Sequence, residues 1–342
     1  MKKVFSTATL FLIVAFVAVL LPIHRTHALT ITPIRLEING NPGQVLSQQM
    51  TLINEQNVPA TYYVSYANFE TRGETGSPSF VDATDDLGTW MSAPSSVTVP
   101  AKTSIIVPIQ ITIPRDANPG GHFASIFWGT VAPDAASGQV AIGTKMGLLV
   151  LLRVNGEINE EGGILEFSTK DARTFFTALP ISFQYRFQNA GDDRIKPTGD
   201  VIIKNTFGMV AKKISGNPVE GNILPRSIRK FETVWEGKDG ATPKEDIRQG
   251  NFFTKAQYEW RNFAFGRYRA TMALSYGTKN EVATSTFAFW VFPWHLSLVS
   301  LITALVLFFI SRMMIRRYNR WVIKQARTMM KRESENAHEK EK

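Results

Sequence analysis

Apolar and polar residues alternate along several stretches in the middle of the chain, which is the pattern of a strand with one buried face. Clear examples are residues 107–113, 181–187 and 268–276. Turn sequences rich in Gly, Asn and Pro separate such stretches, and no long amphipathic helical pattern occurs between Leu29 and Val291. The pattern predicts an all-β protein built from antiparallel sandwiches.

A polar, glycine-rich segment around residues 155–163 follows the continuous apolar strand 148–154. We place a domain boundary there. The sequence therefore predicts two tandem immunoglobulin-like β-sandwich domains, at 29–156 and 163–290, each close to the usual size of such a domain.

The two predicted domains share an order of landmarks, which suggests related folds. Each has a strand that ends in Asn, then a Pro turn that leads into a strand, then a Gly that opens a later strand. The landmarks are Asn54, Pro100 and Gly121 in the first domain and Asn189, Pro225 and Gly266 in the second.

The N-terminus carries an export signal. Lys2 and Lys3 precede the apolar run Val4–Leu21, and a small-residue cleavage site ends at Ala28. This is the layout of a signal peptide over residues 1–28. The apolar run is also long enough to remain as an uncleaved anchor, and both interpretations take the following residues out of the cytoplasm.

A second apolar run, Leu296–Ile310, predicts a transmembrane helix over 291–311. Trp290 and Trp294 are placed for the outer membrane interface, where aromatic side chains concentrate. Basic residues follow the span at once and mark its cytoplasmic side: Arg312, Arg316, Arg317 and Arg320. We expect a single-pass cell-membrane protein with its ectodomain outside and its C-terminus inside.

The tail, 312–342, has the pattern of a basic amphipathic helix. It can lie on an anionic inner leaflet, or it can dock a cytoplasmic partner.

Net charge argues against nucleic-acid binding. The 342-residue chain has a formal charge of +9. The excess lies in 1–28 and 312–342, because acidic and basic residues balance between 29 and 311. A nucleic-acid-binding protein needs clustered positive charge on its folded part.

Candidate chemistry is sparse. The chain has no Cys, and His122 is the one histidine between the predicted export and membrane segments. No Gly-x-Ser-x-Gly motif accompanies His122. The acidic residues Asp82, Asp85 and Asp86 suit a solvated loop or a calcium site, although their spacing matches no EF-hand. We expect no enzyme, no cofactor and no metal.

Aromatic residues interleaved with bases make 238–265 the most unusual segment. They can stack on a glycan or anchor a partner protein, or they can pack onto the second domain as part of a long connection. The candidate ligand-binding residues are Trp90, Phe252, Phe253, Tyr258 and Trp260.

The order of several motifs resembles the WxL-interacting proteins of Gram-positive cell surfaces. The motifs are Ile31-Thr32-Pro33, 97–102 and 113–123 in the first domain and 222–227 in the second. The resemblance implies a peptidoglycan-binding first domain, a second sandwich domain implicated in host binding, one membrane span and a basic tail.

The sequence thus favours a membrane-anchored extracellular binding or adhesion protein that displays two β-sandwich modules. Its expected ligands are cell-wall glycan, peptidoglycan in particular, or another surface protein. The alternative is an extracytoplasmic chaperone or assembly accessory that acts by strand-edge donation. A third hypothesis is a sensor that couples the ectodomain to a cytoplasmic partner through the tail.

Overall fold

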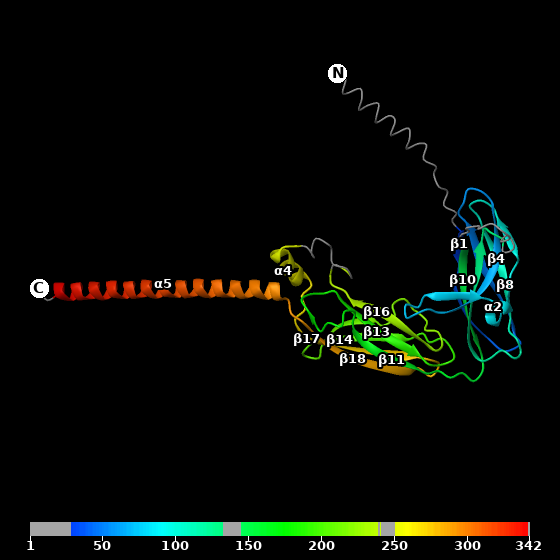
Figure 1. Cartoon of the computed structure of the whole chain (residues 1–342). Helices are drawn as coiled ribbons and strands as arrows, with labels where there is room; N and C mark the ends of the chain where they lie inside the picture. The colour runs from blue at the N-terminus through cyan, green and yellow to red at the C-terminus, as the bar shows by residue number, and fades with distance from the viewer. Residues whose placement is uncertain (1–28, 133–144, 239, 241–249, 341–342) are drawn as a thin grey trace, which may run out of the picture. The chain divides into compact units, whose positions relative to one another are not determined.

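A computed structural model describes residues 29–132, 145–238, 240 and 250–340 (Figure 1). The predicted signal peptide, 1–28, lies outside the described residues. The chain is mostly β, with one long apolar helix at its C-terminus. Its contacts divide it into unit 1 (Met1–Arg72 and Ser77–Asn159) and unit 2 (Gly73–Gly76 and Glu160–Lys342).

Unit 1 contains two sheets. The first has the order β1 (Leu29–Thr32), β3 (Val45–Asn54), β8 (Ser104–Thr112) and β6 (Met91–Ser92). The second has the order β2 (Arg35–Gly40), β10 (Lys145–Val154), β9 (Gly120–Gly129), β4 (Ala60–Thr71) and β5 (Pro78–Asp82), with β7 (Ser96–Val99) also paired to β4. A short helix, α2 (Asp86–Trp90), precedes β6.

Unit 2 also contains two sheets. The first has the order β11 (Gly162–Thr169), β13 (Ile181–Asn189) and β16 (Ser227–Trp235). The second has the order β12 (Phe175–Phe176), β18 (Glu281–Val291), β17 (Gly266–Tyr276), β14 (Thr198–Lys204) and β15 (Val210–Ser215). Helices α4 (Phe252–Arg261) and α5 (Trp294–Lys340) complete the unit.

The predicted period of two is confirmed in the burial of the strands. Alternate residues of β8, from Val107 to Ile111, and of β13, from Ile181 to Phe187, are fully covered. Inward-facing residues from both sheets of a unit form one apolar core. Each unit is therefore a β-sandwich.

The two sandwiches share one topology. In each, the first strand pairs with the third, β1 with β3 and β11 with β13. The second strand pairs in parallel with the last, β2 with β10 and β12 with β18. The order β2-β10-β9-β4-β5 repeats as β12-β18-β17-β14-β15. The sequence landmarks occupy matching places in this order. Each asparagine ends β3 or β13, each proline precedes β8 or β16, and each glycine lies at the start of β9 or β17.

A buried asparagine ends the third strand of each unit and bonds to three equivalent backbone groups. The Asn54 Nδ2 donates to the carbonyls of Val58 and Val99, and its Oδ1 accepts from the Gln56 amide. Asn189 repeats these bonds, donating to Asp193 and Ile223 and accepting from Gly191. The asparagine thereby fixes the turn after its strand to the segment before the proline turn.

Two elements differ from the sequence-based prediction. The segment 252–261, within the long connection between β16 and β17, forms a helix that the sequence pattern did not predict. The Asn251 side chain caps this helix by accepting from the Thr254 amide. The apolar helix α5 starts at Trp294, three residues after the predicted start of the membrane span at 291. Val291 still pairs with Gly266 in the sheet, and Pro293 separates the strand from the helix.

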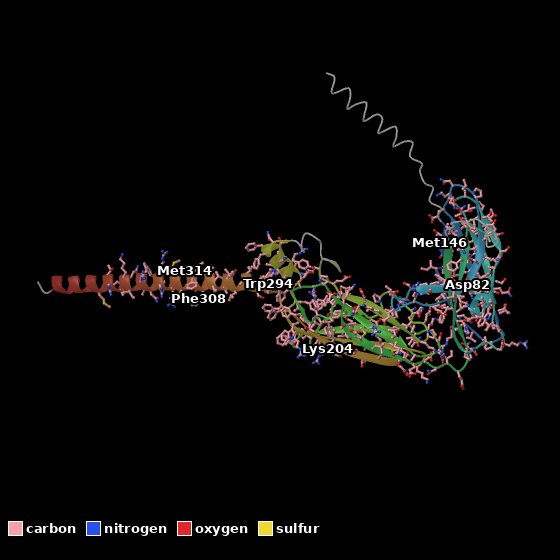
Figure 2. All side chains as sticks on the ribbon, in the orientation of Figure 1. Asp82, Met146, Lys204, Trp294, Phe308 and Met314 are labelled. Atoms are coloured by element: carbon pink, nitrogen blue, oxygen red, sulfur yellow. The ribbon has the colours of Figure 1, made fainter. Side chains whose placement is uncertain are left out.

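Helix α5 runs without a break from the apolar segment into the tail (Figure 1). Among the described residues it is the one helix that is long and apolar enough to cross a membrane. Figure 2 labels Trp294, Phe308 and Met314 along it. Trp294 and Arg312 are 18 residues apart, about 27 Å of helix, which matches the hydrocarbon thickness of a bilayer.

Candidate functional site

The last strand of unit 2 has a long edge that its own sheet does not cover. In unit 1, β2 pairs with β10 over six residues, Leu149–Val154. In unit 2, β12 pairs with β18 only at Trp290 and Val291. Within the described residues, no strand pairs with the outer edge of β18 from Glu281 to Phe289.

The backbone groups on this edge can be assigned from the hydrogen bonds at its end. The Trp290 amide donates outward to the Thr174 carbonyl, and the Phe292 amide donates outward to the Phe176 carbonyl. The pairing of β17 with β18 has no bulge. Every second residue before Trp290 therefore directs its N–H and C=O outward, namely Val282, Thr284, Thr286 and Ala288.

The core beside this edge is incompletely closed. Ile164 on β11 and Ala283 and Phe287 on β18 are only partly buried, although all three pack against the core of unit 2. The Phe287 and Phe167 rings meet with their centroids 6.4 Å apart. A strand placed along β18 would add apolar side chains over these residues.

The uncovered stretch of β18 is also chemically unlike the other edges. From Val282 to Phe289 it contains no charged residue and no Pro. Proteins usually protect open edges with charges, Pro or very short strands. The longer edge strands of the described chain carry such residues: Arg35 in β2, Pro78 in β5, Glu166 in β11, Lys212 in β15 and Lys230 in β16.

Tyr276 holds the start of this edge in place. Its hydroxyl donates to the Gly162 carbonyl over 2.6 Å and lies 3.0 Å from the Glu281 carboxylate. Burial raises the pKa of Tyr276, and the hydrogen bond with Glu281 raises it further. Tyr276 therefore remains protonated at neutral pH and ties β11 to the start of β18.

Four of the five candidate ligand-binding aromatics lie on α4. Phe253 and Trp260 point to solvent, whereas Tyr258 is buried and donates its hydroxyl to the Leu179 carbonyl over 2.9 Å. The Phe252 ring packs against Trp294 at the start of α5. Tyr258 is thus a packing residue of α4, and Phe253 and Trp260 form its exposed face.

Trp90 belongs to unit 1 and is half-buried against the core of that unit. Its ring lies 4.7 Å from that of His122. The His122 Nδ1 meets the Asp86 carboxylate and its Nε2 meets the Asn118 carbonyl, so both ring nitrogens are engaged. His122 is therefore a structural residue on β9 rather than a free base.

The described residues contain no group of three His, Asp or Glu side chains placed to hold a metal ion. Asp85 stands at the start of α2, where its side chain makes no capping hydrogen bond. The Asn68 side chain donates to the Asp85 carbonyl and accepts from the Gly88 amide.

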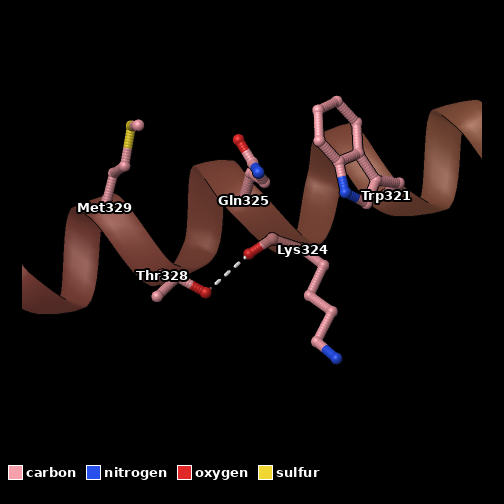
Figure 3. Close-up of a pocket in the computed structure, with 5 residues that line it drawn as sticks. All are labelled: Trp321, Lys324, Gln325, Thr328 and Met329. Atoms are coloured by element: carbon pink, nitrogen blue, oxygen red, sulfur yellow. Dashed lines mark hydrogen bonds between the residues drawn. The ribbon is translucent and has the colours of Figure 1, made fainter.

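A groove of about 410 Å³ follows the exposed tail helix (Figure 3). Trp321, Lys324, Gln325, Thr328 and Met329 line it, and all five lie on α5. The groove is thus a strip along one helix rather than an enclosed cavity.

No family model matches the chain, and no curated protein matches its sequence. Solved structures that match it include the class 5 fimbriae chaperone CfaA, with 12% identity over 77% of this chain and 99% of that chain and a TM-score of 0.38. The E. coli chaperone DraB matches with 10% identity, 78% and 97% coverage and a TM-score of 0.33. The Pseudomonas aeruginosa CupB2 chaperone matches with 10% identity, 76% and 100% coverage and a TM-score of 0.33. Identities and TM-scores this low do not assign a function to this chain.

Proposed function

We propose that this chain is a membrane-anchored binding protein that holds an extended segment of a protein partner by β-strand addition to β18. The observation that carries the proposal is the uncharged, Pro-free outer edge at 282–289, with which no described strand pairs. Such an edge serves an adhesion protein and an assembly accessory equally, so the proposal joins the two functions that the sequence favours.

The energetics of strand addition suit this edge. A partner strand can bond to the outward N–H and C=O groups of four residues, and each backbone hydrogen bond contributes about 0.5–1.5 kcal/mol net. It can also cover Ile164, Ala283 and Phe287, and buried apolar area contributes about 25 cal/mol per Å². Backbone pairing supplies affinity, and alternate partner side chains supply selectivity.

The two sandwiches are a tandem of immunoglobulin-like domains, supported by their shared strand order. They stand outside the cell, supported by the basic residues that follow the apolar part of α5. Non-enzymatic recognition agrees with the scarcity of candidate chemistry.

A backbone-specific variant tests the proposal. Thr286→Pro removes an outward N–H without breaking the ladder to β17, because Pro is tolerated where the amide faces away from the sheet. A photo-crosslinking amino acid at Thr284 of the full chain, in its native membranes, should form a discrete protein adduct. We expect Thr286→Pro to reduce the adduct about tenfold, which corresponds to about 1.4 kcal/mol.

Thr286→Val is the matched control, because it alters the same side chain and keeps the N–H. It should leave the adduct unchanged. Equal adduct formation in the Pro variant and the parent would contradict strand addition at β18.

A second proposal concerns unit 1. The resemblance to WxL-interacting proteins implies peptidoglycan binding there, and the aromatic ring of Trp90 beside polar His122 favours a sugar ligand. Full chain in nanodiscs should sediment with purified peptidoglycan. An absence of binding at low salt would count against this second function.

A further inference from the structure

The end of unit 2 from which α5 emerges carries a concentration of exposed aromatic side chains. Three separate segments supply them: the β14–β15 turn, α4 with the loop after it, and the end of β18. We call this set the aromatic rim; it consists of Phe207, Phe253, Trp260, Phe263, Phe265 and Trp290. Every member is more than half exposed, with Phe207 at 85% and Phe253 at 73%.

Strand register shows that these segments share one end of the sandwich. Gly266 at the start of β17 pairs with Val291, three residues before α5 begins. Lys204 at the end of β14 pairs with Arg269, close to the same start of β17. The β14–β15 turn that holds Phe207 therefore lies at the end where α5 leaves, and Figure 2 shows Lys204 and Trp294 at this end.

The outward face of α4 is fixed by contacts on its other side. Phe253, Gln257 and Trp260 are exposed at spacings of four and three residues, which place them on one helix face. On the inner side, the Glu259 carboxylate accepts from the Leu296 amide over 2.8 Å and lies 2.6 Å from the His295 Nδ1. The helix is thus bound to the first turn of α5 with two aromatic rings directed to solvent.

A basic groove of about 250 Å³ adjoins the rim. Lys204, Arg267 and Arg269 line it together with Thr206, and none of its lining residues is acidic. No ion pair engages these three basic side chains within the described residues. In contrast, Lys213 on the neighbouring strand pairs with Asp200 over 2.9 Å.

We propose that this end of unit 2 rests on the lipid leaflet that α5 enters first, with the aromatic rim at the headgroup boundary and the basic groove on lipid phosphates. The lipid surface is favoured over a protein occupant because ring contacts join the rim to the apolar start of α5. The Phe265 ring packs against Phe292, and the Phe252 ring packs against both Phe253 and Trp294. Trp and Phe suit the interface, and bases beside it attract anionic headgroups. Unit 2 then has a fixed height above the membrane rather than hanging from a free tether.

The absence of Cys permits a direct test with single labels on the full chain. Spin labels at Gln257→Cys and Met209→Cys report on the rim in nanodiscs of phosphatidylcholine and phosphatidylglycerol. We expect both labels to collide more often with oxygen, which concentrates in lipid, than with a water-soluble nickel chelate. Lys279→Cys is the control, because it lies in the exposed turn at the opposite end of β18 and should show the reverse ratio.

A charge variant tests the groove. Combining Lys204→Gln, Arg267→Gln and Arg269→Gln should raise nickel collisions at position 257, as should nanodiscs of phosphatidylcholine alone. We expect each neutralised base to lower the ratio of seated to lifted units about fivefold, or about 1 kcal/mol. Lys279→Gln should have no effect.

Labels at 257 and 209 that collide with nickel as readily as the label at 279 would overturn the proposal. Labels that neither reagent reaches would also overturn it, because they would show a protein contact instead. If position 257 is protected from nickel collisions in the triple variant and in uncharged lipid to the same extent as in the parent, the assignment of the groove to lipid phosphate is overturned.

Discussion

Asn54 and Asn189 occupy equivalent positions in the two units, and each ties its strand end to the segment before the proline turn. Both were visible as strand-ending landmarks in the same order along the two domains. Their buried amide bonds to the segment before the proline turn join residues that are 45 and 34 positions apart in the chain. Spacing alone does not encode such contacts, so only the landmarks could be predicted.

Tyr185 is a second residue whose role only the structure reveals. It is fully buried, stacks on Phe231 with ring centroids 4.9 Å apart, and its hydroxyl has no hydrogen-bond partner among the described residues. An unpaired buried hydroxyl costs free energy. We expect Tyr185→Phe to raise the free energy of unfolding by about 1 kcal/mol at neutral pH, as measured by denaturant titration of the full chain.

The same variant should change the response to alkaline pH. Burial raises the pKa of the Tyr185 hydroxyl far above its ordinary value of 10.0. A raised folded-state pKa gives stability that is complete below the unfolded-state pKa and is lost as pH rises toward the folded-state value. Tyr185→Phe should therefore lose less stability than the parent between about pH 9 and pH 11. Equal losses would contradict the assignment.

At the scale of elements, strands were predicted more successfully than their edges. The alternation in β8, β13 and β17 reports directly which face of a strand is buried, so those strands could be read from the sequence. Helix α4 could not be predicted from the sequence, because five of its ten residues are aromatic or β-branched and such residues have a weak helical propensity. Its Asn251 cap and its packing against α5 stabilise it instead.

The open edge of β18 was likewise hidden. How much of the last strand's edge is paired depends on where the chain leaves the first sheet and crosses to the second. The strand before this crossing has four residues in unit 1 (β1) and eight residues in unit 2 (β11). A signal was nevertheless present. The polar positions of 282–288 are Thr and Ser rather than Lys or Glu, which is unusual for a strand that meets solvent.

At the scale of the whole molecule, the proposed function places the sandwiches and the tail on opposite sides of one membrane. We expect a membrane-impermeant maleimide to label Lys279→Cys on intact cells. Arg327→Cys should react only after permeabilisation, because the basic residues of the tail favour the cytoplasmic side. Labelling of the two sites in the reverse order would contradict this orientation.

Amide hydrogen exchange along β18, in the full chain in nanodiscs without a partner, reports whether the outer edge of this strand is open. An open edge predicts rapid exchange at Val282, Thr284, Thr286 and Ala288 and slow exchange at Ala283, Ser285 and Phe287, whose amides bond to β17. Slow exchange at all seven amides would show that the edge is already covered and would contradict strand addition as the function of this protein.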